Sequence, residues 1–120
     1  GPKDKKDLCI NRMSPKDFRL LSSSGTMDRR DGVADADTYG DLKKALKTVG
    51  FHTRRQMDLF RVTCALMHAY NLSFLDIGED ASALDKGNSS LKATVNLLGV
   101  TENDLNSALC SCKIEAAGEK

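Results

Sequence analysis

The stretch from Met57 to Ala69, MDLFRVTCALMHA, constrains the fold of this chain more than any other part of the sequence. Drawn as a helix, it places apolar side chains on nearly every side, and a helix with so little polar surface is usually covered on several sides. Thr53 and Gln56 have the spacing of a capping box at its start, and we expect it to end near Tyr70–Asn71. The sequence therefore predicts a mainly helical fold organised around this segment.

Further helices are predicted on both sides of this central segment. One covers roughly Ala36–Val49, and Gly50 after it is the residue type that most often stops a helix. A short helical turn is expected at Ser14–Asp17, where a capping residue precedes a proline. Two more helices are expected, the first after Ser89–Ser90 and the second from the Thr101–Asp104 capping box. The predicted fold class is mainly α, a small subdomain of about four to five helices with one or two short β-strands.

A short strand is predicted after the central helix. Residues 72–77, LSFLDI, alternate well enough between apolar and polar side chains to suit a strand. A strand this short needs a pairing partner, and no second strand is evident in the sequence. We therefore expect the partner to lie outside these residues. The polar stretch Gly78–Asn88, GEDASALDKGN, is predicted to be a surface loop.

The chain of 120 residues is long enough for one compact domain, which we place at residues 14–114. Residues 1–13 are expected to be a flexible segment that starts with a protease-cleavage remnant, Gly1–Pro2. Residues 115–120 are expected to be a flexible tail. The chain has no initiator Met and no signal-peptide pattern, so we expect it to be a piece of a longer protein.

Charge and hydropathy exclude several classes of partner. The formal net charge is only +1, from 18 basic and 17 acidic residues, which gives no electrostatic basis for binding nucleic acid or an anionic membrane surface. No apolar run approaches the roughly 18 residues that a membrane span needs. The four cysteines do not have the spacing of a disulfide framework, which favours a reducing, intracellular location.

Cysteine and histidine residues offer one candidate metal site. Cys64 and His68 lie four residues apart on one face of the central helix, and Cys110 with Cys112 could complete a zinc site. Residues two apart on a helix point roughly 200° away from each other, however, so Cys110 and Cys112 converge only if their helix has ended. We interpret Cys64 and His68 as core residues without a metal, and keep a small zinc-bound domain as an alternative. The apolar surroundings of Cys64 also disfavour a cysteine nucleophile.

Acidic side chains near the predicted loop offer a second candidate. Asp76, Glu79, Asp80 and Asp85 could collect a calcium ion, but the alternating ligands and the final glutamate of an EF-hand loop are missing. A solvated acidic loop is the simpler interpretation. The sequence also lacks the G-x-x-x-x-G-K-[ST] and G-x-G-x-x-G phosphate-binding motifs. We therefore predict no catalytic, cofactor-binding or metal-binding residue in this chain.

Five stretches, taken in chain order, resemble parts of one known family, the myosin motor domain. They are FRLLSSSG at Phe18–Gly25, DGVADADTY at Asp31–Tyr39, ALKTVGF at Ala45–Phe51, FRVTCALMHAYNLSF at Phe60–Phe74, and LLGVTENDLNSAL at Leu97–Leu109. Ala69 and Tyr70 replace the family's usual leucine–glycine pair before Asn71, which indicates a divergent member.

The resemblance implies a place within the motor head and a set of partners. The segment corresponds to the upper 50K subdomain, between switch I and switch II, so the Mg-ATP site and the ATPase activity belong to the parent head and the chain itself holds no cofactor. The loop at Gly78–Asn88 corresponds to loop 4, which in the family can contact actin. Its candidate contact residues are Glu79, Asp80, Asp85 and Lys86. The implied partners are the actin filament and the rest of the head, in a cytoplasmic, cytoskeleton-associated location.

A stand-alone helical protein-interaction module is the alternative to a segment of a motor head. A segment of a head should expose apolar surface that its neighbours would cover, and such surface allows self-association. A stand-alone module should instead be a compact monomer without an exposed apolar patch.

Overall fold

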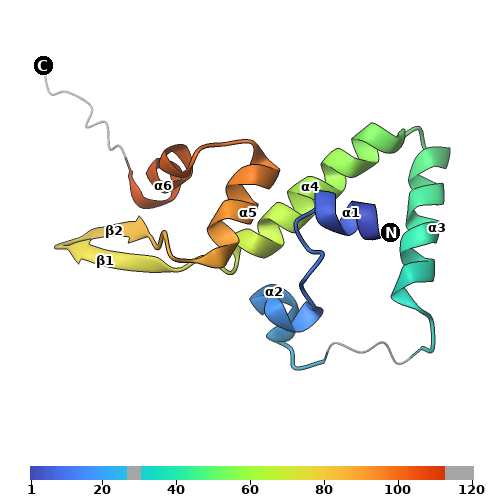
Figure 1. The fold of residues 1–120 in the computed structure, drawn as a ribbon, viewed down its shortest axis with the longest axis horizontal. Helices are drawn as coiled ribbons and strands as arrows, with labels where there is room; N and C mark the ends of the chain where they lie inside the picture. The colour runs from blue at the N-terminus through green and yellow to red at the C-terminus, as the bar shows by residue number, and fades with distance from the viewer. Residues whose placement is uncertain (27–30, 113–120) are drawn as a thin grey trace, which may run out of the picture.

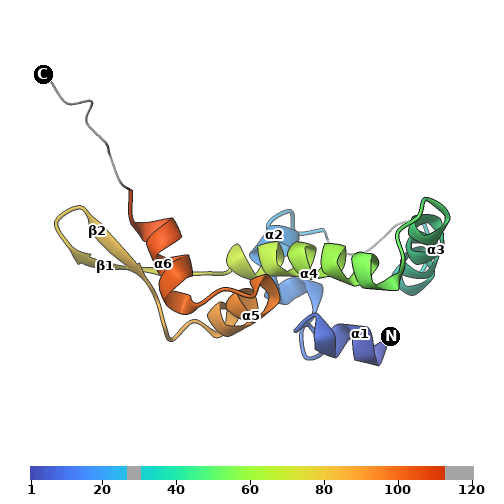
Figure 2. The same cartoon turned by 90° about the horizontal axis from the view of Figure 1, so that it is seen from above.

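The computed structural model describes residues 1–26 and 31–112. The molecule is elongated, measuring 62 × 34 × 24 Å, with helix α3 (Asp35–Thr48) at one end and a hairpin of β1 (Phe74–Gly78) and β2 (Ala81–Leu84) at the other (Figures 1 and 2). Helix α4 (Thr53–Ala69) runs between these ends. The structure confirms the mainly helical fold class with short strands, and the tail expected at 115–120 lies outside the described residues.

The N-terminal segment, which the sequence suggested would be flexible, contains helix α1 (Pro2–Asp7). Leu8 follows this helix, is only 5% exposed and packs into an apolar cluster. The Asp4 carboxylate accepts hydrogen bonds from Tyr39 Oη and from Lys43 Nζ of α3, both at 3.3 Å. The N-terminal segment is therefore held by contacts with residues far along the chain, which its own composition does not reveal.

The helical turn expected at Ser14–Asp17 is present as the short 3-10 helix η1 (Pro15–Asp17), which leads into α2 (Arg19–Ser22). The Asp17 carboxylate accepts hydrogen bonds from the Ser14 backbone N–H at 2.6 Å and from Ser14 Oγ at 2.9 Å. These bonds confirm the predicted helix start. The next residue, Phe18, is 3% exposed, so the chain enters the protein interior directly after η1.

Helices α3 and α4 occupy the predicted positions, but Gln56 does not have its predicted role. His52 is the N-cap of α4, so Gln56 stands one position too far into the helix for a capping box. Its buried side chain instead donates from Nε2 to the carbonyl oxygens of Phe51 at 2.7 Å and of Lys43 at 3.1 Å. The predicted capping box was wrong, and Gln56 joins the start of α4 to the middle of α3 and to the connection between the two helices.

Helix α4 is covered along one side only, whereas the sequence predicted cover on several sides. Three large apolar residues on its exposed side form what we call the α4 stripe: Leu59, Val62 and Leu66, which are 45%, 51% and 60% exposed. Apolar spacing shows which side chains favour burial, but it does not show whether the element that buries them belongs to the same stretch of chain. Among the described residues, neither α4 nor any other helix is long and apolar enough to cross a membrane.

The strand partner lies within the chain, so the prediction that it lies outside was wrong. β1 pairs with β2 in an antiparallel hairpin in which Phe74 stands opposite Leu84. β2 falls inside 78–88, the stretch predicted to be loop throughout. Its sequence, ASAL, is short and poor in residues that favour strands. Three features define this strand: its pairing with β1, the left-handed turn at Asp80 (φ +56°) and the burial of Leu84. None of them produces an alternation of apolar and polar residues that could be seen in the sequence.

The two helices predicted near the end of the chain are α5 (Ser89–Leu98) and α6 (Glu102–Cys110). The N-cap of α5 is Asn88 rather than a serine, because Asn88 Oδ1 accepts a hydrogen bond from the Ser90 N–H at 2.9 Å. The predicted capping box of α6 is confirmed: Thr101 Oγ1 donates to the Asp104 carboxylate at 2.7 Å and accepts from the Asp104 N–H at 3.1 Å.

Two small apolar clusters hold these elements together. The buried members of the first cluster are Leu8, Cys64, Ala65 and Leu97, which join the N-terminal segment to α4 and α5. The buried members of the second cluster are Leu72, Leu84 and Leu91, which join the hairpin to α5. The second cluster therefore fixes the base of the hairpin, while β1 and the tip stay exposed.

Candidate functional site

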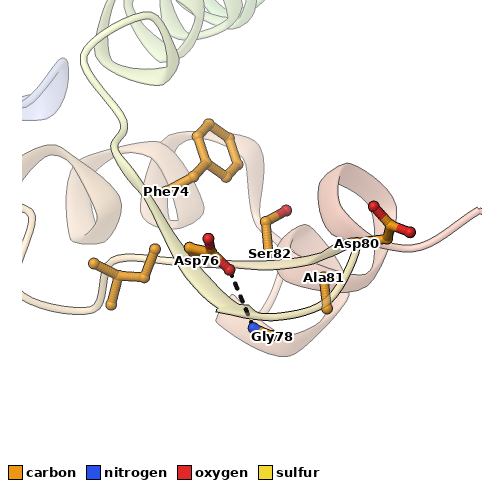
Figure 3. Close-up of a pocket in the computed structure, with 7 residues that line it drawn as sticks. Phe74, Asp76, Gly78, Asp80, Ala81 and Ser82 are labelled. Atoms are coloured by element: carbon orange, nitrogen blue, oxygen red, sulfur yellow. Dashed lines mark hydrogen bonds between the residues drawn. The ribbon is translucent and has the colours of Figure 1, made fainter.

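The hairpin projects beyond the helices at one end of the molecule (Figure 2). Every residue of β1 is exposed, and a hollow of about 420 Å³ lies on the hairpin (Figure 3). Its lining includes Phe74, Asp76, Asp80 and Ser82, and Asp76 Oδ1 accepts a hydrogen bond from the Gly78 N–H at 3.1 Å. The hollow is wide open to solvent, which suits contact with the surface of a partner better than enclosure of a small ligand.

The four loop residues singled out in the sequence separate into two pairs. Glu79 and Asp80 form the exposed turn at the tip, between β1 and β2. Asp85 and Lys86 follow β2, where the hairpin joins the helices; Lys86 is exposed and Asp85 is half-buried. The tip pair is therefore the part of this set that a partner approaching the end of the molecule would meet first.

Asp85 is engaged in hydrogen bonds at the base of the hairpin. Its Oδ2 accepts from Ser73 Oγ at 3.1 Å, and its Oδ1 accepts from the Gly87 N–H at 2.9 Å. Its own backbone N–H donates to the Ser73 carbonyl at 2.9 Å. We name Asn71, Ser73, Asp85 and Asn88 the hairpin base. Within it, the Asp85 carboxylate closes the hairpin rather than facing a partner.

Asn88 connects the hairpin base to the helices. Its Nδ2 donates to the Asn71 carbonyl and to Ser73 Oγ, both at 2.9 Å, while its Oδ1 caps α5. Neither Asn71 nor Asn88 was predicted from the sequence to be a site residue. The only available signal was local: asparagine is common where one helix ends and where the next begins.

His68, near the end of α4, is only 2% exposed. The Phe18 ring meets it edge-on with the ring centroids 5.2 Å apart, and Nδ1 lies 3.5 Å from Ser90 Oγ. Nε2 has no hydrogen-bond partner among the described residues. Burial lowers the pKa of His68, and the nearby backbone of Cys9 opposes this effect only in part. The ring is therefore a neutral part of the core at pH 7, as its apolar surroundings in the sequence indicated.

The candidate zinc ligands lie in different surroundings. Cys64 is buried in the first apolar cluster, where burial and then the nearby Cys9 raise the pKa of its thiol. Cys110 packs against the second cluster, and Cys112 is exposed beyond the end of α6. Across residues 1–26 and 31–112, no group of three or more His, Cys, Asp or Glu side chains is arranged to hold a metal ion.

Comparison with known proteins identifies the family. The family model described as myosin head (motor domain) matches residues 1–120. The chain is 33% identical over 112 residues to Myosin-13 of Arabidopsis thaliana, a match that covers 91% of this chain and 7% of that protein. It is 33% identical over 100 residues to the Myosin ID heavy chain of Dictyostelium discoideum, with 81% of this chain and 9% of that protein covered.

Myosin-16 of Arabidopsis thaliana is 37% identical over 100 residues, a match that covers 80% of this chain and 8% of that protein. The chain thus spans less than a tenth of the length of these curated relatives. The family model spans every described element from α1 to α6, and each of these relatives matches 80% or more of the chain. The chain belongs to the myosin head (motor domain) family.

Proposed function

We propose that this chain forms a segment of the upper 50K subdomain of a myosin-like motor head, an actin-based ATPase. The exposed hairpin carries this proposal, because its tip and β2 fall within Gly78–Asn88, the stretch that the sequence resemblance assigns to loop 4. The hairpin is fixed near its base, where it packs on α5 and where the Leu84 N–H donates to Asn106 Oδ1 of α6 at 2.8 Å. In the intact head the segment would support the actin-binding cleft and help to transmit its closure to the nucleotide site. ATP hydrolysis and attachment to the cytoskeleton would be properties of the parent head.

The α4 stripe supports a segment of a larger head over a stand-alone interaction module. Its three side chains follow the i, i+3, i+7 spacing of one helical face, and each is close to half exposed or more. A compact monomer seldom leaves such a ridge in water. We propose that other parts of the motor head cover it in the parent protein. In isolation, the same face would let the chain self-associate.

The isolated chain is expected not to bind nucleotide, because its sequence contains neither of the common phosphate-binding glycine motifs. Isothermal titration calorimetry of the folded 120-residue chain with Mg-ATP should give the heat of dilution alone. Micromolar, magnesium-dependent binding would contradict the proposal that the nucleotide site lies elsewhere in the head.

The tip of the hairpin provides a separate test of actin contact. The double substitution Glu79→Lys/Asp80→Lys is expected to strengthen cosedimentation of the chain with actin filaments several-fold at low salt. The physical reason is that attraction to the acidic filament surface replaces repulsion from it. The gain should shrink as ionic strength rises, because salt screens exposed charges over about 10 Å at 0.1 M.

The matched control makes the same change of charge at the opposite end of the molecule. Asp37 and Asp41 are exposed on α3, far from the hairpin (Figure 1). Asp37→Lys/Asp41→Lys should leave cosedimentation close to that of the unmodified chain. An equal gain in both variants would show a general effect of net charge, and no gain in the tip variant would remove the tip from the actin interface.

A further inference from the structure

Residues Asp17–Arg19 are held at three points by His68, at the end of α4, and by Asn71, just after it. The Arg19 backbone N–H donates to Asn71 Oδ1 at 2.9 Å, and Asn71 Nδ2 donates to the Asp17 carbonyl at 2.7 Å. Between these two bonds, the buried ring of Phe18 packs edge-on against His68. The two hydrogen bonds join residues that are 52 and 54 positions apart in the sequence. They are therefore tertiary contacts rather than features of a local turn.

Asn71 also belongs to the hairpin base. Its backbone carbonyl accepts a hydrogen bond from Asn88 Nδ2, which donates to Ser73 Oγ as well. Asn88 also binds the backbone of Ser90, whose hydroxyl lies 3.5 Å from His68 Nδ1. These contacts close a ring that passes through Asp17–Arg19, Asn71, Asn88, Ser90, His68 and Phe18.

We propose that Asn71 is a positioning residue that couples the hairpin to the Asp17–Arg19 segment, so that the two shift together. A primary amide suits this role, because its oxygen accepts from one backbone N–H while its NH₂ group donates to a backbone carbonyl. The Arg19 N–H lies in the first turn of α2, where a helix offers no acceptor of its own, and α2 has no side-chain cap from its N-cap residue. Asn71 supplies that missing acceptor from just beyond the end of α4. This coupling does not depend on whether the hairpin tip touches actin.

Amide hydrogen exchange in the 120-residue chain, measured residue by residue by NMR, tests this coupling. Asn88→Ala removes the contact on the hairpin side and is expected to accelerate exchange of the Arg19 N–H at least fivefold, although Asn88 makes no hydrogen bond to Arg19. Asn71→Ala is expected to accelerate exchange of the Asp85 N–H, which bonds to the Ser73 carbonyl, by a similar factor. Each amide monitored in this way is one that the substitution does not touch directly.

Two outcomes would overturn the proposal. If Asn88→Ala leaves the Arg19 N–H unchanged and Asn71→Ala leaves the Asp85 N–H unchanged, the two segments are independent. If the amides of α3 accelerate by the same factor, the substitutions lower the stability of the whole fold and the coupling is not specific. Loss of a structural bond alone would therefore not reproduce the expected pattern.

Two further variants keep the test decisive. Asn71→Asp keeps the size of the side chain and an oxygen for the Arg19 N–H, but replaces the donor to Asp17 by an acceptor. Asn71→Asp is also expected to accelerate exchange of the Asp85 N–H. It replaces Asn71→Ala in the test if the alanine variant does not fold. Asn103→Ala, at an exposed asparagine of α6, is the matched control and should leave these rates unchanged.

Discussion

Replacing Leu91 with alanine is expected to lower the free energy of unfolding by about 2–5 kcal/mol, the range observed for leucine-to-alanine changes in protein cores. Leu91 is 1% exposed and packs in the second apolar cluster with Leu72 and Leu84. Truncation would remove its apolar contacts and leave a cavity between the hairpin and α5. Since small domains are stable by only about 5–15 kcal/mol, a loss of this size is a large part of the total.

Urea unfolding followed by circular dichroism measures this change, and Leu98→Ala on the same helix is the matched control. Leu98 is 41% exposed, so its truncation should cost less than about 1 kcal/mol. Both substitutions change leucine to alanine in α5, so the two sites differ mainly in the burial of the side chain that is removed. Equal losses at the two sites would mean that the second cluster contributes no more to stability than the exposed surface does.

The helices were predictable because their boundaries depend on residues close together in the chain. Ser14 and Asp17 make the expected bonds at η1, and Thr101 and Asp104 make those at α6. A cap is complete within three residues, so its pattern is visible in the sequence. Gln56 shows the limit of this reasoning: its spacing fits a capping box, yet its amide serves a contact between two helices.

The hairpin and the cover of α4 depend instead on contacts that no local pattern specifies. β2 has a weak strand sequence and exists because β1 lies beside it. The apolar α4 stripe indicated burial, but the element that would bury it is not present in the described residues. Periodicity reports the preference of a side chain for burial and leaves the identity of its neighbour open.

The candidate site was predictable only in outline. The acidic stretch was identified from composition, but composition could not separate Glu79 and Asp80 at the tip from Asp85, whose carboxylate binds Ser73 and Gly87. The roles of Asn71 and Asn88 were missed altogether. An asparagine that forms hydrogen bonds to a backbone more than 50 residues away has the same sequence context as one that ends a helix.

The second large effect that we expect is a loss of stability at acidic pH, because protonation of the buried His68 ring destabilises the folded state. Burial lowers the pKa of the ring in the folded state below the ordinary value of 6.5, and the nearby backbone of Cys9 offsets this lowering only in part. The chain has two histidines, and the other, His52, is exposed. Asp4 and Asp17 have carboxyl pKa values below their ordinary 3.8, so they stay ionised in the pH range where a free histidine titrates.

The stability of the chain is therefore expected to be nearly constant between about pH 7 and pH 8 and to fall as the pH drops through about 6.5, because the unfolded chain takes up the His68 proton first. The raised pKa of the buried Cys64 thiol lowers stability only at higher pH, where the unfolded chain loses that proton first. Each tenfold difference in proton affinity between the folded and unfolded states corresponds to about 1.4 kcal/mol of stability.

Urea unfolding at pH 7.5 and pH 5.5 measures the slope, which is the change in the free energy of unfolding with pH. His68→Gln should remove most of it, whereas His52→Gln should leave it intact. A slope that survives His68→Gln would assign the pH dependence to other groups, and a slope absent from the unmodified chain would mean that the folded protein solvates the charged ring as well as water does.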